Sequence, residues 1–272
     1  SRINAIIPPL ALDGPCVSIR KFRREMLRET DMLVYGTLNQ EMLDLLILAV
    51  KSRCNIMVSG GTGTGKTTLL NTLSRFIDPA QRIVTIEDAA ELQLGHNHVV
   101  RLETRPPTIE GDGEVRARDL VRNALRMRPD RIILGEVRGE EVLDVLQAMN
   151  TGHDGSMSTV HANNPRDALV RLEMLASLAN FKGAHDVIRE MISSAVDLMV
   201  HISRFADGTR RITSIAEITG HRDGQYLLNE LFSYNHPLNR HEINNVRPVN
   251  EKFTSGNQHS KNHRLTSVSP DF

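Results

Sequence analysis

The chain has 272 residues, 40% hydrophobic and 24% charged, which is enough for one sizeable core with smaller attachments. Its 33 Lys and Arg residues balance 33 Asp and Glu residues, so no overall positive field draws it to nucleic acid or to an acidic membrane. The two cysteines, Cys16 and Cys54, exclude a disulfide framework and a four-thiolate zinc module, and apolar runs such as 45–50 are far shorter than the roughly 20 residues of a membrane-spanning helix.

The first elements in chain order are an irregular opening segment and a helix. Residues 3–22 carry three prolines between short apolar runs, a pattern typical of loops and edge strands. A helix is predicted over 37–51, with Thr37 as its cap because Gln40 follows three positions later and apolar residues share one face.

After this helix, β-like runs alternate with helical stretches. The runs are 56–59, 83–86, 132–134 and 156–160. The alternation predicts an α/β fold in which a mostly parallel sheet is flanked by crossover helices. Two of these helices have clear ends: one stops at Gly152, and another opens with Asn164 as its cap and Pro165 in its first turn.

The C-terminal part of the chain changes character. Runs at 198–205 and 210–218 flank Asp207-Gly208, a turn pair that favours a β-hairpin. Beyond about Tyr234 the chain is polar and rich in Asn, Ser and His, so we expect a flexible tail. The expected divisions are an opening segment at 1–30, an α/β domain at 31–230 and a polar tail at 231–272.

The strongest motif is a phosphate-binding loop, Gly-x-x-x-x-Gly-Lys-Thr, between a predicted strand and a predicted helix. In such a loop backbone N–H groups surround a phosphate, and the following helix points its positive end at the anion. Lys66 is expected to neutralise the β- and γ-phosphates of ATP, and the Thr67 hydroxyl to bind Mg²⁺. A glycine-rich turn that binds nothing is the alternative. The residues predicted to hold the nucleotide are Gly60, Gly61, Thr62, Gly63, Thr64, Gly65, Lys66, Thr67 and Thr68.

Acidic residues follow two of the predicted strands. Glu136 comes after the run 132–134, and Glu87 and Glu91 come at and after the end of the run 83–86. Open α/β sheets bind ligands at the carboxyl ends of their strands. We therefore expect Glu136 to organise Mg²⁺ in the Walker B role and a carboxylate of the other group to polarise the attacking water. The alternative is that acids end strands because strand ends are solvated.

Residues 36–218 resemble the ATPases of type II secretion, type IV pili and conjugation. The resemblance rests on the phosphate loop, Thr-Ile-Glu-Asp-Ala-Ala-Glu-Leu at 85–92, Ile-Ile-Leu-Gly-Glu-Val-Arg-Gly at 132–139 and the histidine-containing run at 151–163. It implies a RecA-like P-loop ATPase domain at 31–230, with a base-binding stretch at 35–38. Roles around the γ-phosphate are implied for Glu87, Glu91, Glu136, His153 and His161. For each histidine alone, the alternative is a structural hydrogen bond to a carbonyl.

The resemblance also implies how the protein is assembled and where it acts. The expected state is a hexameric ring in the cytoplasm, which works on inner-membrane platform proteins of a pilus or secretion machine. Because the net charge is zero, no direct binding of nucleic acid is expected. Residues 3–10 and 18–22 resemble the end of the family's N-terminal domain, so 1–30 is expected to be its remnant. Arg101 and Arg105 are predicted to reach the γ-phosphate across a subunit boundary, where positive charge stabilises the transferred group. Solvated surface cations are the alternative.

The run Arg-Leu-Glu-Thr-Arg-Pro at 101–106 looks closest to the Tad/Flp pilus ATPases, with conjugation ATPases as near relatives. A P-loop GTPase or kinase is a rival, although the chain has no Asn-Lys-x-Asp sequence for guanine. A nucleotide-binding scaffold with little turnover and a DNA-handling conjugation ATPase also stay open. A zinc site at His96 and His98 is disfavoured because these residues have no cysteine partners and no helical His-x-x-x-His spacing.

Overall fold

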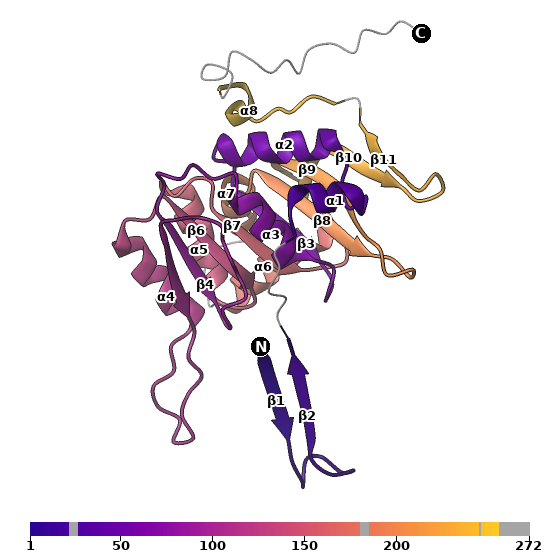
Figure 1. Cartoon of the computed structure of the whole chain (residues 1–272). Coiled ribbons are helices and arrows are strands. Elements are labelled where there is room, and N and C mark those ends of the chain that lie inside the picture. The colour runs from indigo at the N-terminus through magenta and orange to yellow at the C-terminus, as the bar shows by residue number, and fades with distance from the viewer. Residues whose placement is uncertain (22–26, 180–184, 245, 256–272) are drawn as a thin grey trace, which may run out of the picture.

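A nine-stranded sheet forms the centre of the computed structural model, which describes residues 1–21, 27–179, 185–244 and 246–255 (Figure 1). The strand order is β11-β10-β9-β8-β3-β7-β6-β4-β5, and the strands from β8 to β5 run parallel. These parallel strands are β3 (Ile56–Gly60), β4 (Ile83–Glu87), β5 (Val99–Glu103), β6 (Arg131–Val137), β7 (Met157–His161) and β8 (Leu198–Arg204). The expectation of an α/β fold with a mostly parallel sheet is confirmed.

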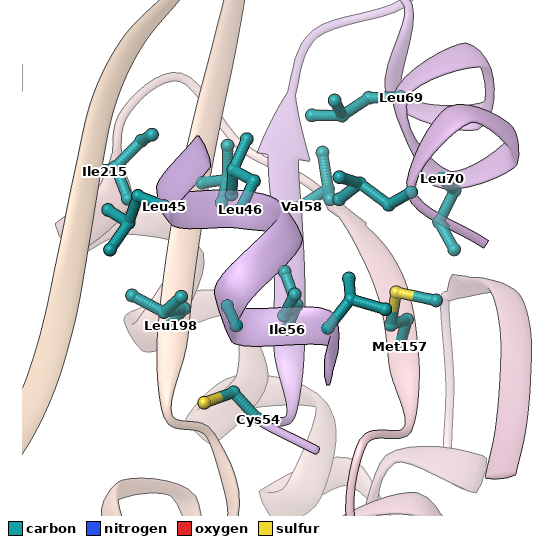
Figure 2. Packing of buried hydrophobic residues seen from close by; sticks show 14 of the residues in the cluster. Leu45, Leu46, Cys54, Ile56, Val58, Leu69, Leu70, Met157, Leu198 and Ile215 are labelled. Atoms are coloured by element: carbon teal, nitrogen blue, oxygen red, sulfur yellow. The ribbon is translucent and has the colours of Figure 1, made fainter. Parts of the chain in front are cut away.

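Helices cover both faces of the parallel part of the sheet. Successive residues of β3 serve opposite faces, since Ile56 and Val58 belong to one hydrophobic core and Met57 to the other. Figure 2 shows part of the first core, which includes Leu45 and Leu46 of 40–51 together with Ile56 and Val58 of β3. The helices of this first face are α1 (Glu29–Val34), α2 (Gln40–Lys51) and α3 (Lys66–Ser74), and those of the second face are α4 (Ala117–Ala124), α5 (Glu141–Asn150), α6 (Pro165–Leu178) and α7 (His185–Ala195), with the 3₁₀ turn η1 (Leu125–Met127) after α4.

Two predicted helix starts have different outcomes. The Asn164 side chain accepts a hydrogen bond from Asp167 N at 2.8 Å and Pro165 is the first helical residue, so this cap is confirmed. The Thr37 cap is wrong, because Asn39 accepts from the backbone of α2 instead. The backbone of Thr37 is engaged elsewhere, since its carbonyl accepts from Ile212 N at 2.8 Å.

Antiparallel strands extend the sheet beyond β8. The predicted hairpin forms between β8 and β9 (Arg210–Arg222), and β10 (Gln225–Asn235) and β11 (Arg240–Ile243) follow. The expectation of a flexible tail from 231 is therefore wrong for its described part, because this part includes β11 and a short helix α8 (Glu251–Ser255). A half-buried edge strand needs few apolar residues, which is why the polar composition of this segment did not predict a strand. Residues 256–272 of the expected tail lie outside the described residues.

The opening segment forms a two-stranded antiparallel ladder of its own. Its strands are β1 (Arg2–Ile6) and β2 (Cys16–Arg20), and all their residues are exposed. Figure 1 shows this ladder standing away from the main sheet. In the described part of the chain, no helix is both long and apolar enough to cross a membrane.

Candidate active site

A cleft of about 940 Å³ lies at the carboxyl edge of the parallel strands. The loops after β3, β4, β6 and β7 all reach it, because parallel strands present the same ends to one edge of a sheet. The predicted site residues that line it are Thr62, Gly63, Thr64, Gly65, Lys66, Thr67, Thr68, Glu87, Glu91, Glu136 and His161. Tyr35 and Thr37 line it as well, from the stretch 35–38 that the family resemblance assigns to the base.

The phosphate loop owes its shape to close backbone packing. A side chain at Gly60 would place its Cβ only 2.3 Å from the carbonyl oxygen of Ile202 on β8. Gly65, which precedes α3, has a φ of +105°, a conformation that favours glycine. Lys66 is the first residue of α3, and its Nζ donates to the carbonyls of Gly60 and Gly61 at 2.8 Å each. The loop thus holds a cation beside the N-terminus of a helix, an arrangement suited to phosphate.

Glu87 at the end of β4 holds the backbone of the acidic run 85–92 in place through hydrogen bonds. Its Oε1 accepts from the backbone N–H groups of Glu91 and Leu92 at 2.9 and 2.8 Å. Burial raises the pKa of Glu87, and these two hydrogen bonds oppose that shift. Glu91 is more accessible, with 20% of its side chain exposed and Oε2 3.8 Å from Arg20. Glu87 therefore fixes the turn, while Glu91 offers a carboxylate to the cleft.

Glu136 near the end of β6 is the centre of a group of charges. Its Oε2 accepts from Arg138 at 2.7 and 3.0 Å, and the same guanidinium donates to Asp88 at 2.5 Å. Nδ1 of His161, the last residue of β7, lies 3.9 Å from Oε1 of Glu136. Burial lowers the pKa of Lys66, and the charge of Glu136 counteracts this shift. Arg138 thus links the acidic groups of β4 and β6.

The two histidines of the run 151–163 lie at opposite ends of β7. His161 ends the strand and lines the cleft, whereas His153 precedes the strand and does not line it. The His153 carbonyl accepts from Ser156 Oγ at 2.7 Å, and its buried Nδ1 has no hydrogen-bond partner among the described residues. The family resemblance implied a role at the γ-phosphate for both residues, but a five-residue strand, roughly 15 Å long, lies between them.

Arg101 and Arg105 do not line the cleft of their own chain. Arg101 lies on the edge strand β5, and its Nη2 donates to the carbonyl of Leu92 at 2.9 Å. Arg105 follows this strand, and its Nε donates to the carbonyl of Gly113 at 2.7 Å. Within one chain, these arginines brace loops near the sheet edge.

Several cleft residues were not singled out from the sequence. Arg210 on β9 donates from Nε to the carbonyl of Gly63 at 2.9 Å, and the hairpin turn at 207–209 lines the cleft beside it. The turn itself was predicted, but its approach to the phosphate loop requires β8 to lie next to β3, which no local pattern encodes. Arg2, Arg20 and Lys21 also line the cleft.

The chemistry of the cleft suits a phosphate ligand and a small hard cation. Mg²⁺ is usually held by one or two protein groups together with phosphate oxygens and water. Thr67 and Glu136 both line the cleft and supply the hydroxyl and the carboxylate for such an ion. Among the described residues, no group of three or more His, Cys, Asp or Glu side chains could hold a metal alone. The residues therefore fit an ion that binds together with a phosphate ligand.

Comparison with known proteins identifies relatives along most of the chain. Residues 2–245 match the family described as Type II/IV secretion system protein. The chain is 44% identical over 215 residues to a Mycobacterium tuberculosis protein named for conjugal transfer, covering 79% of this chain but only 60% of that protein. It is 37% identical over 228 residues to the conjugal transfer protein TrbB of Rhizobium radiobacter, covering 83% of this chain and 67% of TrbB.

Among solved structures, the fold is similar to the VirB11 ATPase of the Brucella suis type IV secretion system, determined in complex with sulphate. The TM-score is 0.58 at 31% sequence identity, and the match covers 79% of this chain and 70% of that one. At this identity and coverage, the fold is that of a secretion ATPase.

Proposed function

Because the chain belongs to the type II/IV secretion system protein family and is related to conjugation ATPases, we propose that it hydrolyses ATP with Mg²⁺ to drive type IV secretion or conjugal transfer. The observation that carries the proposal is a single cleft that brings together the phosphate loop, Glu91, Glu136 and His161. The names of the relatives favour secretion and conjugation. The run at 101–106 favours the Tad/Flp pilus machine as the second candidate.

Side chains that line the cleft are assigned roles in ATP hydrolysis according to whether they are free to contact the ligand. Lys66 binds the β- and γ-phosphates, and Thr67 and Glu136 hold Mg²⁺, which neutralises charge on the transferred phosphoryl group when it is bound. Glu91 orients the attacking water, because one oxygen of Glu87 is already engaged by two backbone N–H groups. His161 assists beside Glu136.

A ring of subunits is part of the proposal. Arg101 and Arg105 lie at the β5 edge and miss the cleft of their own chain, as expected of residues that serve a neighbouring subunit. A head-to-tail contact that closes would repeat this arrangement, and six RecA-like subunits are proposed from the family resemblance. The ring would act at the cytoplasmic face of the inner membrane on platform proteins, with 1–30 as the end of an N-terminal domain.

Steady-state ATP hydrolysis with Mg²⁺ tests the proposed activity. Replacing Lys66 with Ala should lower kcat/KM by at least about 100-fold, because the cation that faces the phosphates is lost. Lys51→Ala at the exposed end of α2 is the matched control and should leave hydrolysis unchanged. Full activity of the Lys66 variant would contradict the proposal.

Subunit mixing tests the ring. A chain with Arg101→Ala and Arg105→Ala and a chain with Glu136→Gln should each be inactive alone. If the arginines act across the boundary, some mixed interfaces combine an intact Glu136 with intact arginines, and activity returns. Mixed oligomers that form but stay inactive would show that the arginines serve their own subunit.

A further inference from the structure

The β8–β9 hairpin contacts the phosphate loop from the side opposite to the acidic residues. In the sheet order, β8 and β9 lie on one side of β3, while β7, β6 and β4 lie on the other. Arg210 donates to the carbonyl of Gly63, and a Cβ added to Gly65 would lie 3.4 Å from Cδ of Arg210. One arginine of β9 thus packs along the backbone that surrounds the phosphate position.

The next two residues of β9 hold the far wall of the same cleft. Arg211 Nη1 donates to the carbonyl of Tyr35 at 2.5 Å, and Ile212 N donates to the carbonyl of Thr37 at 2.8 Å. Gly36 between them has a φ of +61°, and a Cβ there would lie 3.1 Å from Arg211 Nη1. Three successive residues of one strand therefore tie together two segments that are far apart in the sequence.

The orientation of a bound nucleotide follows from this order of strands. In the roles proposed above, Glu136 and His161, on the β6 and β7 side of the cleft, lie at the terminal phosphate, so the rest of the ligand extends toward β8 and β9. The cleft at that end is lined by Met32, Tyr35 and Thr37, which offer apolar surface and backbone groups of the kind that hold a planar base.

We propose that β9 sets the distance between the phosphate loop and the base-binding wall, with Arg210 and Arg211 as positioning residues that make the cleft select a nucleoside triphosphate over inorganic polyphosphate. The proposal rests on the proposed function. A wall fixed in advance spares the ligand the entropic cost of ordering residues 35–37 on binding. Loss of the Arg211 contact should therefore weaken binding of the base but not of the phosphates.

Binding measured by calorimetry, with ATP and inorganic tripolyphosphate as ligands, tests this division. Arg211→Ala should weaken ATP about tenfold, equal to roughly 1.4 kcal/mol, and change tripolyphosphate by less than about twofold. Arg210→Ala should weaken both ligands, because it loosens the phosphate loop. Arg211→Lys should recover most of the ATP affinity, since an ammonium can still donate to the Tyr35 carbonyl. Arg222→Ala, at the exposed end of the same strand, is the matched control and should change neither ligand.

The outcomes separate this inference from the proposed function. Equal weakening of ATP and tripolyphosphate in the Arg211 variant, or no weakening of ATP, would overturn the positioning role. Retained tripolyphosphate binding in that variant shows that it has folded. A wild-type chain that binds tripolyphosphate as tightly as ATP would also overturn the inference, whereas a wild-type chain that binds neither ligand would overturn the proposed function itself.

Discussion

Polar residues gather at both ends of the parallel strands, the amino edge and the carboxyl edge of the sheet. Several of them are buried and hydrogen-bonded to more than one partner at the amino edge, whereas several remain accessible at the carboxyl edge. At the amino edge, Asn55 precedes β3 and is only 1% exposed. Its side-chain oxygen accepts from Gly155 N and Ser156 N at 2.9 and 3.1 Å, and its side-chain nitrogen donates to the carbonyl of Ala195 at 2.8 Å. This one side chain joins the starts of three strands, β3, β7 and β8.

Charged groups at the amino edge are satisfied in the same way. Arg131, at the start of β6, donates to Gln81 and to the carbonyls of Val50 and Gly155, and burial lowers its pKa to about 10. Lys252 of α8 lies 2.8 Å from Asp197, which immediately precedes β8. With several partners each, these groups are committed to the fold.

At the carboxyl edge, Glu87 is buried, but other polar side chains that line the cleft remain accessible. The side chains of Arg138, His161 and Glu136 are 49%, 45% and 23% exposed. Exposed ion pairs contribute little to stability because water screens them. The comparison teaches that substitutions at the amino edge should alter folding, and substitutions at the carboxyl edge should alter ligand chemistry.

Glu136→Gln should give the largest effect, at the carboxyl edge alone. The amide keeps the shape but loses the charge that holds Mg²⁺, so kcat should fall by about 1,000-fold while ATP still binds. Turnover assays measure kcat and calorimetry measures ATP binding. Thermal unfolding checks that the variant is as stable as the wild-type chain. Glu242→Gln on β11 is the control, and a Glu136 variant with normal hydrolysis would remove this residue from the mechanism.

Asn55→Ala should give the next effect, at the amino edge alone. It leaves two backbone N–H groups and two carbonyls without their partner and opens a small void, so the free energy of unfolding should fall by about 3 kcal/mol. Urea unfolding measures this loss. Asn150→Ala, which removes one exposed hydrogen bond, should cost less than about 1 kcal/mol. Equal losses in the two variants would contradict the larger cost expected for the buried side chain.

Arg138→Ala should give the smallest effects, with tighter Mg²⁺ binding but slower turnover. Without this cation, Glu136 and Asp88 attract Mg²⁺ more strongly, so half-saturation should occur at a lower Mg²⁺ concentration. The kcat should fall by about tenfold, because Glu136 loses the partner that orients it. Arg122→Ala, a similarly exposed arginine paired with Asp144, is the control. A higher Mg²⁺ requirement in the Arg138 variant would instead indicate a general loss of structure.

Features that depend on residues close together in the sequence could be predicted from the sequence. The phosphate loop between a strand and a helix, the Asn164 cap and the hairpin at Asp207-Gly208 all follow from backbone preferences within a few positions. The wrong cap shows where local preferences stop being sufficient. Thr37 and Asn39 are both good caps, and only the contact of Thr37 with β9 shows which residue is engaged elsewhere.

Strand order was decided by the tertiary structure alone. Both histidines of the run 151–163 were expected near one phosphate, but the direction of β7 leaves His161 at the cleft and takes His153 to the other edge. The same order places Arg210 beside Gly63, 147 residues away in the chain. Periodicity and turn chemistry determine which elements form, because they act over short distances. Which elements become neighbours depends on the burial of whole faces of the sheet, a property that no single segment contains.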